Sequence, residues 1–218
     1  MVTAQQITDT VSKVRGTTGV KRNFSQSFEI LISLKDIDQK KNPLNINDVV
    51  FLPHDLSTKP KICVFATRDF ASRSKKAGAD RVIEGDELDK LAGQKRDIRK
   101  ICSQHTFFLA EVSLMAKIGK IFGQFLGPRG KMPAPLPPNA SVESIIDRYR
   151  RAVRVRSRSQ MAATCKVGDQ KMADERITEN SLSIIDAIEK KLPSGSKNIK
   201  NIKLKLTMTE PVTIKAKV

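Results

Sequence analysis

The chain has 218 residues, 39% of them hydrophobic, which is enough for one large or two small domains and argues against wholesale disorder. It carries 40 Lys and Arg against 23 Asp and Glu, giving a formal net charge of +17 and a pI near 10.0. This excess favours a polyanionic partner such as nucleic acid, because basic groups that neutralise phosphates release bound counterions.

Cysteine usage and hydropathy exclude two further classes of protein. Cys63, Cys102 and Cys165 are scattered and odd in number, which predicts a reducing compartment and no disulfide framework. No apolar run approaches the roughly 20 residues of a membrane span, and the first residues lack the apolar core of a signal peptide. We therefore expect a cytoplasmic protein with no membrane partner.

The N-terminal part of the chain predicts a helix and two strands. Thr3 followed by Gln6 is typical of a capping box, and apolar residues then recur at helical spacing until Gly16. Residues 23–34, NFSQSFEILISL, end in a strict alternation of apolar and polar side chains, the period of a half-buried strand. The apolar run 49–53 ends in a proline and predicts a short second strand.

The middle of the chain alternates predicted strands with predicted helices. The compact apolar runs are typical of strands buried on both faces, and a strand–helix–strand order favours parallel pairing through a right-handed crossover. We expect strands at residues 61–66, 80–84 and 106–110, and helices at 68–77 and 111–120. These elements predict a small, doubly wound α/β domain, residues 59–155, inserted into the rest of the chain.

The C-terminal part supplies partners for the first strand. A helix from Ser141 has an intensely basic end, and a strand at 161–167 and a helix at 178–192 follow. Residues 202–206 and 212–218 again alternate apolar and polar side chains. Because amphipathic strands at both ends need a shared sheet, we predict a discontinuous domain, residues 1–58 plus 156–218. It would be an α+β sandwich with helices on one face of a mostly antiparallel sheet.

Catalytic and cofactor signatures are absent from the sequence. The turn Thr67-Arg68-Asp69 after the first inserted strand has no glycine, so a pyrophosphate could not approach the backbone closely. His54 and His105 have no Cys or carboxylate at ligand spacing, and no catalytic-triad order appears. We predict no metal, no cofactor and no enzyme activity. An RNA-processing hydrolase and a general basic RNA chaperone remain as alternatives.

Residues 119–139 contain four glycines followed by four prolines and are the most unusual segment. The sequence Gly-Pro-Arg-Gly from Gly127 is turn chemistry, because proline fixes φ and glycine permits positive φ. The segment lacks the Lys-Ser/Thr ending of a P-loop. It is either a structural turn or a rigid loop that presents Arg129 and Lys131 to RNA phosphate or a neighbouring protein, and its spacing does not choose between them.

Phe24 is a candidate nucleic-acid contact at the start of the first strand. It follows Arg22 and precedes Ser27, and an aromatic ring beside basic and hydroxyl groups can pack on a ribose or a base. The alternative is that Phe24 is a core residue. Aromatic residues are only 5% of the chain, so we expect recognition of RNA shape and 2′-OH groups instead of stacking of many bases. The matching turn near the C-terminus is Thr207, Met208 and Thr209.

The segment Gly123–Ala134, GQFLGPRGKMPA, closely resembles the signature of the ribosomal protein L1 family, the lateral-stalk protein of the large ribosomal subunit. Four further segments resemble this family in the same order, so that the resemblance covers essentially the whole chain. They are NFSQSFE from Asn23, LPH from Leu52, KAGAD from Lys76, and the Thr207-Met208 turn. The PAPLPPN segment and the NFSQSFE form are similar to the archaeal branch.

This resemblance implies a two-domain protein whose first, discontinuous domain binds large-subunit ribosomal RNA, and whose second, inserted domain is Rossmann-like. It also implies binding to the protein's own mRNA, with repression of its translation. On the ribosome, it implies a mobile stalk that helps deacylated tRNA leave the exit site. We expect a cytoplasmic, ribosome-associated protein that is a monomer when free.

The resemblance also assigns RNA-binding residues to this chain. The first strand and the C-terminal turn match the family's RNA contacts, and two arginines match basic positions at the return into the first domain. With the neighbouring Arg22 and Thr209, the predicted set is Arg22, Phe24, Ser27, Glu29, Arg156, Arg158, Thr207, Met208 and Thr209.

The sequence departs from the family pattern at two places. Thr209 and Glu210 follow Thr-Met where the family usually has glycine, which changes both the side chain and the charge near a phosphate. Asp55 stands where many relatives have a hinge glycine.

Overall fold

The computed structural model describes residues 2–17, 22–37, 46–137, 141–157 and 160–214. Its backbone contacts divide the chain into two compact units. Unit 1 comprises Met1–Thr58 and Ala152–Val218, and unit 2 comprises Lys59–Arg151.

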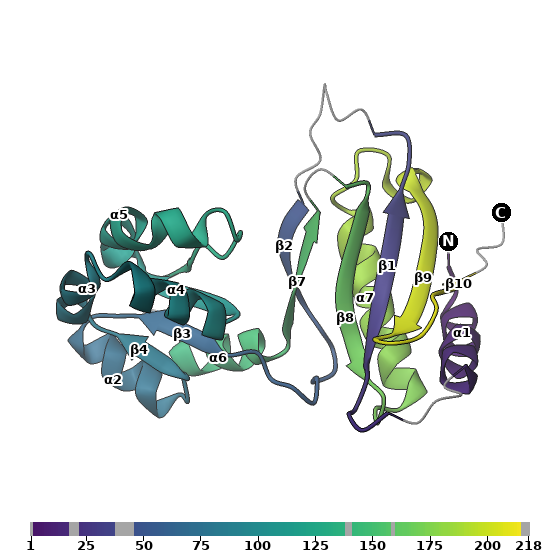
Figure 1. The fold of residues 1–218 in the computed structure, drawn as a ribbon, viewed down its shortest axis with the longest axis horizontal. Coiled ribbons are helices and arrows are strands. Elements are labelled where there is room, and N and C mark those ends of the chain that lie inside the picture. The colour runs from purple at the N-terminus through teal and green to yellow at the C-terminus, as the bar shows by residue number, and fades with distance from the viewer. Residues whose placement is uncertain (1, 18–21, 38–45, 138–140, 158–159, 215–218) are drawn as a thin grey trace. The chain divides into compact units, whose positions relative to one another are not determined.

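Unit 1 is built on a four-stranded antiparallel sheet in the order β10-β9-β1-β8 (Figure 1). A separate antiparallel pair, β2 with β7, belongs to the same unit. The predicted pairing of the first strand with C-terminal strands is therefore correct. The strands are β1 (Ser27–Leu34), β2 (Ile46–Phe51), β7 (Ala152–Ser157), β8 (Ala162–Asp169), β9 (Ile199–Leu206) and β10 (Val212–Ile214).

Two helices, α1 (Ala4–Gly16) and α7 (Asp174–Glu189), pack with one face of this sheet into a common core. Phe28, Ile30 and Ile32 of β1 are fully buried there, while the alternate residues of β1 face away and are only half-buried. The period of two in the sequence thus identified the core face of β1. A 3-10 turn, η2 (Gly195–Asn198), follows α7 and leads into β9.

Gly168 lets α7 pack closely on the sheet. It lies opposite Phe28, beside a register shift between Phe28 and Glu29. A Cβ at residue 168 would lie 2.9 Å from Cγ1 of Ile177 on α7, a distance that side chains essentially never adopt. Any larger residue would therefore push the helix away from the strand.

Unit 2 is built on a four-stranded parallel sheet in the order β4-β3-β5-β6. Its strands are β3 (Ile62–Phe65), β4 (Arg81–Ile83), β5 (Phe107–Glu111) and β6 (Ala134–Leu136). Its helices are α2 (Arg68–Lys76), α3 (Gly85–Leu91), α4 (Lys95–Gln104), α5 (Met115–Leu126) and α6 (Val142–Arg150), with a 3-10 turn η1 (Val112–Leu114).

The helices of unit 2 cover both faces of its sheet (Figure 1). On one face, Phe65 of β3 contacts Phe122 of α5, with ring centroids 5.2 Å apart, in a core that α3, α4 and α5 share. On the other face, Phe107 of β5 contacts Tyr149 of α6 at 5.4 Å. This agrees with continuous apolar runs, since a strand covered on both sides has no polar face.

The mixed α/β class is confirmed, and several element boundaries need correction. The helix predicted from residue 178 begins at Asp174. The helix from Ser141 ends at Arg150 with Arg148 and Arg150 in its last turn, as predicted, whereas Arg154 and Arg156 lie in the strand β7, which pairs with β2. Two helices and an edge strand were not predicted: α3, α4 and β6. The end of the predicted strand 212–218 lies outside the described residues.

Candidate nucleic-acid interface

Segments from distant parts of the sequence meet at one end of the unit 1 sheet. Strand β1 begins there, while β8 and β9 end there, because Ser27 lies opposite Asp169 and Phe28 lies opposite Leu206. The residues before β1 are therefore neighbours of the turn after β9. We call residues 22–27, 169–170 and 207–209 the sheet end.

Gln26 connects the three segments of the sheet end. Its side chain is 3% exposed, and its Oε1 accepts a hydrogen bond from the backbone N–H of Met208 at 3.1 Å. Its own N–H donates to Oε1 of Gln170 at 3.3 Å, and its carbonyl accepts from the N–H of Gln170 at 2.9 Å. The buried side chain of Gln26 thus fixes the Met208 turn against the start of β1, while its backbone bonds hold Gln170.

No role for Gln26 was predicted from the sequence, although a signal was present. Even-numbered residues of the first strand point into the core, and Gln26 continues that series by one step. A polar side chain at an inward position needs a hydrogen-bond partner, so the pattern implied a bridging role. It could not identify Met208 as the partner, because the two residues are 182 positions apart.

Thr207 and Thr209 shape the turn that carries Met208. The hydroxyl of Thr207 accepts from the N–H of Ser27 at 3.1 Å, which extends the pairing of β1 with β9 beyond the last strand residue. The hydroxyl of Thr209 accepts from the N–H of Leu206 at 2.9 Å, and the N–H of Thr209 donates to the Leu206 carbonyl at 3.2 Å.

The departure from glycine at residue 209 leaves this turn intact. Among the described residues other than glycine, only Asp36 has a positive φ, so Thr209 adopts an ordinary backbone conformation. Its hydroxyl also supplies a hydrogen bond that glycine would lack. Glu210 is exposed beside the turn and retains the negative charge noted from the sequence.

Two large apolar side chains are exposed at the sheet end. Phe24 is 48% exposed and Met208 is 59% exposed, so the alternative reading of Phe24 as a core residue is wrong. Arg22 is also exposed. Apolar groups held in solvent beside a cation, on a backbone that is fixed by buried hydrogen bonds, are typical of a surface that meets a ligand.

The outward face of the sheet next to this end is polar and partly basic. Glu29 forms an ion pair with Lys205 of β9, with 3.5 Å between Oε2 and Nζ, and lies opposite Lys166 of β8. Lys166 in turn pairs with Asp169 at 2.5 Å. Lys203 of β9 is also half-buried on this face. The predicted contact Glu29 is therefore surrounded by lysines that can meet phosphate.

Asp169 joins this face to the segment that leaves unit 1. Its Oδ2 accepts from the N–H of Ser57 at 2.8 Å. Burial works to raise the pKa of Asp169, but the hydrogen bonds from Lys166 and Ser57 outweigh burial and hold the pKa below its ordinary value. Nearby, the carboxylate of Glu179 lies 2.6 Å from Nε2 of His54, so His54 contacts helix α7 of its own unit.

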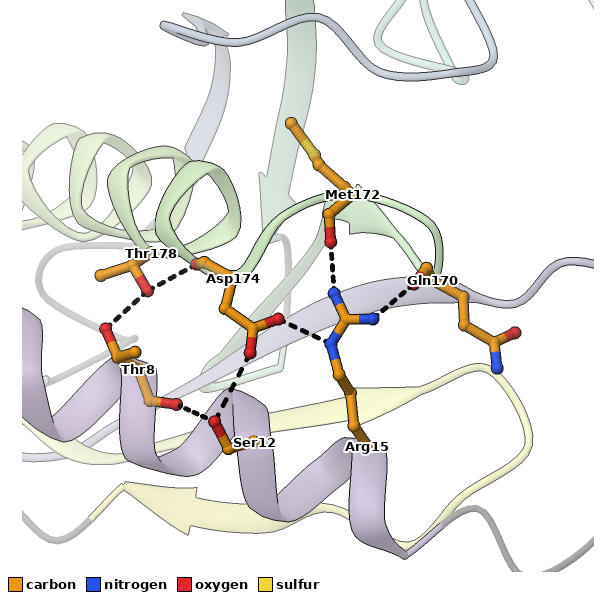
Figure 2. Close-up of polar contacts among 7 residues, drawn as sticks. All are labelled: Thr8, Ser12, Arg15, Gln170, Met172, Asp174 and Thr178. Atoms are coloured by element: carbon orange, nitrogen blue, oxygen red, sulfur yellow. Dashed lines mark hydrogen bonds and ion pairs between the residues drawn. The ribbon is translucent and has the colours of Figure 1, made fainter.

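Arg15 supports the sheet end from below, on helix α1 (Figure 2). Its guanidinium donates to the carbonyl of Gln170 at 2.6 Å and to the carbonyl of Met172, and it lies 2.6 Å from a carboxylate oxygen of Asp174. Its Cζ also lies 5.4 Å from the ring centroid of Phe28. Arg15 thus fixes the loop that holds Gln170, and through Gln170 it positions Gln26.

Not all of the predicted RNA-binding residues meet at this site. The structure brings together Arg22, Phe24, Ser27, Thr207, Met208 and Thr209, with Glu29 next to them on β1. Arg156 lies in β7, opposite Asn47, and β7 leads to the start of β8, a full strand length from Asp169. Arg158 lies outside the described residues.

Unit 2 has a feature that disfavours a nucleotide site. In an open parallel sheet, ligands bind beyond the carboxyl ends of the strands where the strand order reverses, which here is between β3 and β5. Oε2 of Glu111 accepts from both the N–H and the hydroxyl of Thr67 at that point, at 3.0 and 2.7 Å. A side-chain hydrogen bond from Thr67 lowers the pKa of Glu111, so a carboxylate occupies the position that a phosphate would need.

The structure offers no other candidate for chemistry in the parts of the chain that it describes. No group of three His, Cys, Asp or Glu lies close enough to hold a metal within those ranges. None of the helices in them is long and apolar enough to cross a membrane.

Comparison with known proteins gives one consistent result. The model of the ribosomal protein L1p/L10e family matches residues 14–210. Large ribosomal subunit protein uL1 of Cenarchaeum symbiosum is 45% identical over 190 residues, 87% of each chain. The protein of the same name from Thermofilum pendens is 38% identical over 219 residues, which cover 100% of this chain and 96% of the relative. That from Archaeoglobus fulgidus is 40% identical over 196 residues, 90% of this chain and 91% of the relative.

Proposed function

The chain belongs to the ribosomal protein L1p/L10e family, and from this premise we propose that it is a structural constituent of the large ribosomal subunit that binds ribosomal RNA through unit 1. The family is one of structural proteins, so the chain is not an enzyme. The inserted domain is proposed at residues 59–155, as expected from the sequence, and unit 2, Lys59–Arg151, would make up nearly all of it.

The single observation that supports this assignment best is the construction of the sheet end. Gln26 and Thr207 use their hydrogen bonds to fix the local backbone, while Phe24 and Met208 stay exposed beside it. A preformed surface of this kind loses little conformational entropy when it binds, so its contacts translate efficiently into affinity.

In recognition of RNA, the neutral groups of the sheet end and the charged groups beside it would make different contacts. Phe24 and Met208 would pack on exposed ribose or base surfaces, and Ser27 and Glu29 would hydrogen-bond with 2′-OH groups. Lys166, Lys203 and Lys205 on the adjoining face would contact phosphates, which adds affinity that falls with salt. Specificity therefore comes from the sheet end, and its lysine-rich surroundings hold the backbone in position.

Footprinting on large-subunit ribosomal RNA, with filter binding at physiological salt, tests the proposal. We expect one protected region of folded RNA and a preference of at least roughly 100-fold over an unrelated RNA of equal length, as specific contacts give. A general basic chaperone would protect many regions and show little preference. That second result would reject the specific site while leaving family membership untouched.

The remaining roles implied by the family resemblance are proposed on the same basis. The protein would form a mobile stalk that helps deacylated tRNA leave the exit site, in the cytoplasm, and it would be a monomer when free. It would also bind its own mRNA at a similar RNA motif. In cell-free translation of that message, added protein should reduce synthesis, and a ribosomal RNA fragment should restore it by competition.

Arg156 and Arg158 are proposed as contacts to a different part of the same RNA. Arg156 is separated from the sheet end by the length of β8. Replacing Arg156 with Gln should therefore weaken all RNA binding modestly, through lost phosphate contact, without changing the preference for ribosomal RNA.

A further inference from the structure

Unit 2 carries more positive charge than its size and proposed role require. Lys59–Arg151 contains 19 Lys and Arg against 10 Asp and Glu, a net charge of +9 for this smaller unit, whereas the remainder of the chain has +8. Charge of one sign opposes compact folding, so its retention in a unit that is not the main RNA binder calls for a cause.

Much of this charge forms one stripe on helix α4. Lys95, Arg96, Arg99 and Lys100 are all exposed, and their spacing places them on one side of the helix. The buried residues Ile98, Ile101 and Cys102 occupy the opposite side. Residues four apart lie about 6 Å apart along the axis, so the cations form two parallel pairs.

These four cations, unlike Lys75, Arg81 and Lys117 of the same unit, have no carboxylate partner among the described residues. Elsewhere in the unit, Lys75 pairs with Glu84 at 3.0 Å, and Arg81 and Lys117 pair similarly with acidic side chains. Within the described part of the chain, no ion pair involves the α4 stripe, and Asp97 is the only acidic residue on that helix.

One member of the stripe is held by packing. The Cζ of Arg99 lies 5.7 Å from the ring centroid of Phe125 on α5, a cation–π arrangement that limits the freedom of the side chain. Its charge remains exposed to solvent. A guanidinium that is oriented in advance loses less entropy when it meets a phosphate.

The glycine-rich loop after α5 docks on the end of the same helix. Nζ of Lys131 donates to the carbonyls of Cys102 and His105, at 3.0 and 2.6 Å, and so caps the C-terminus of α4. Gly130 has φ +65, and a Cβ at Gly127 would lie 2.9 Å from the Gly123 carbonyl oxygen. The glycines and Lys131 therefore have a structural role, which is one of the two alternatives left open by the sequence.

Burial raises the pKa of the Cys102 thiol, and the positive charges of Arg129 and Lys131 oppose that rise. Arg129 itself is exposed. The stripe of Lys95, Arg96, Arg99 and Lys100 is the surface that we call the α4 surface.

We propose that the α4 surface of unit 2 binds the phosphate backbone of a base-paired RNA segment, separate from the RNA held by the sheet end. The positive charge of the α4 surface favours a polyanion as its ligand. The large exposed side chains of unit 2 in the described ranges are Val112 and Met132, neither of them aromatic, so single-stranded bases have no stacking platform there. A duplex, whose phosphates are exposed and whose bases are hidden, matches this surface best.

The test uses the full-length protein and an RNA duplex of unrelated sequence. The stripe variant carries K95Q, R96Q, R99Q and K100Q. The control carries R68Q, R73Q, K75Q and K76Q on α2, which removes the same charge from exposed positions of the same unit. We expect the stripe variant to bind the duplex at least 10-fold more weakly than the control, with a salt dependence reduced by roughly three phosphate contacts.

Binding of the ribosomal RNA fragment is measured in parallel, so that failure of the two proposals can be told apart. The stripe variant should bind that fragment as well as the α2 control does, because the sheet end is unchanged. Equal loss of duplex binding in both variants would overturn the proposal, since it would mean unspecific attraction by net charge. Stronger loss of binding to poly-glutamate than to the duplex would overturn it in favour of an acidic protein partner.

Circular dichroism and thermal unfolding accompany these measurements. If the stripe variant does not fold, the pairs K95Q/R96Q and R99Q/K100Q replace it, each against two of the α2 substitutions. Each pair should then account for about half of the change in salt dependence. No effect from either pair would reject the α4 surface as a binding site.

Discussion

At the sheet end of unit 1, Gln26 and Thr207 direct their hydrogen bonds to the protein's own backbone, whereas on α4 of unit 2 the cations have no carboxylate partner among the described residues. The first region uses buried neutral groups to fix the exposed Phe24 and Met208. The second presents exposed charge on a helix, with Arg99 packed on the ring of Phe125.

The difference between these regions shows how specificity and affinity for RNA can come from different parts of one basic chain. Directional contacts depend on the exact position of each group, so they fail when the support is removed. Charge contacts depend mainly on the number of cations, so they weaken gradually and respond to salt. Substitutions should therefore have qualitatively different effects in the two regions.

Gln26→Leu should have the largest effect. It leaves the N–H of Met208 without its partner, the side-chain oxygen of Gln26, which costs about 1–3 kcal/mol of unfolding free energy. The bonds between residue 26 and Gln170 use the backbone of residue 26 and are retained. Specific ribosomal RNA binding should fall more than 10-fold, because the Met208 turn is no longer fixed. Urea unfolding and filter binding measure the two effects.

The matched control for that change is Gln5→Leu, at an exposed position of α1 in the same unit. It should leave both stability and binding nearly unchanged. If the Gln26 and Gln5 variants bound ribosomal RNA equally well, the fixed turn would not be needed for recognition.

Arg15→Met should act in the same direction through the loop that Arg15 supports. The substitution removes the hydrogen bonds to two carbonyls and the ion pair with Asp174, so we expect a loss of about 1–3 kcal/mol. Because Arg15 reaches the sheet end through Gln170 and Gln26, the double variant with Gln26→Leu should lose less than the sum of both.

Lys13→Met serves as the control for Arg15→Met. Lys13 is exposed on the same helix, and its replacement removes the same charge. Arg15→Lys should restore part of the specific binding, because a lysine can still donate to one carbonyl. Strict additivity in the double variant would indicate that Arg15 stabilises the fold without positioning the RNA contacts.

Phe24→Ala and Met208→Ala should reduce specific RNA binding and leave stability almost untouched. The side chains are 48% and 59% exposed, so the unfolding free energy should change by no more than about 0.5 kcal/mol. For a side chain packed on a base, truncation costs about 1–3 kcal/mol of binding, or roughly 10- to 100-fold.

Met161→Ala is the control for these two variants. Met161 is 41% exposed and immediately precedes the first residue of β8, whereas the sheet end lies at the last residue of that strand. Binding to unrelated RNA is measured alongside. Equal losses on ribosomal and unrelated RNA for Phe24→Ala would remove the specific role of the sheet end.

The smallest effect should be a dependence of stability on pH that Asp169 introduces. Its pKa in the folded protein is held below the ordinary value, so the charged form is favoured by folding. This contribution is fully present above the unfolded pKa of about 3.9 and is lost as the pH falls through the lower folded pKa. Unfolding free energies measured by urea at pH 7 and pH 3 should therefore differ less in Asp169→Asn than in the wild type.

Local patterns in the sequence predicted much of the framework of the fold. The alternation after Phe28 identified the buried face of β1, and the apolar run 61–66 identified a strand covered on both sides. Helix α4 was not predicted, because its segment is dominated by cations and its few apolar residues give only a weak amphipathic pattern. Strand β7 was read as the end of a helix, because its arginines follow a helical segment directly and only pairing with β2 makes them a strand.

The sequence by itself determined the basic character of the chain and the pairing of its first strand with C-terminal strands, and it offered Phe24 and Met208 as candidates. Only the tertiary structure decided that both are exposed, that Gln26 joins Met208 across 182 positions, and that Lys131 caps α4. The physical reason is that a strand or helix repeats every two to four residues and so leaves a periodic trace. A hydrogen bond between distant segments occurs once, and nothing in the local sequence of either partner records it.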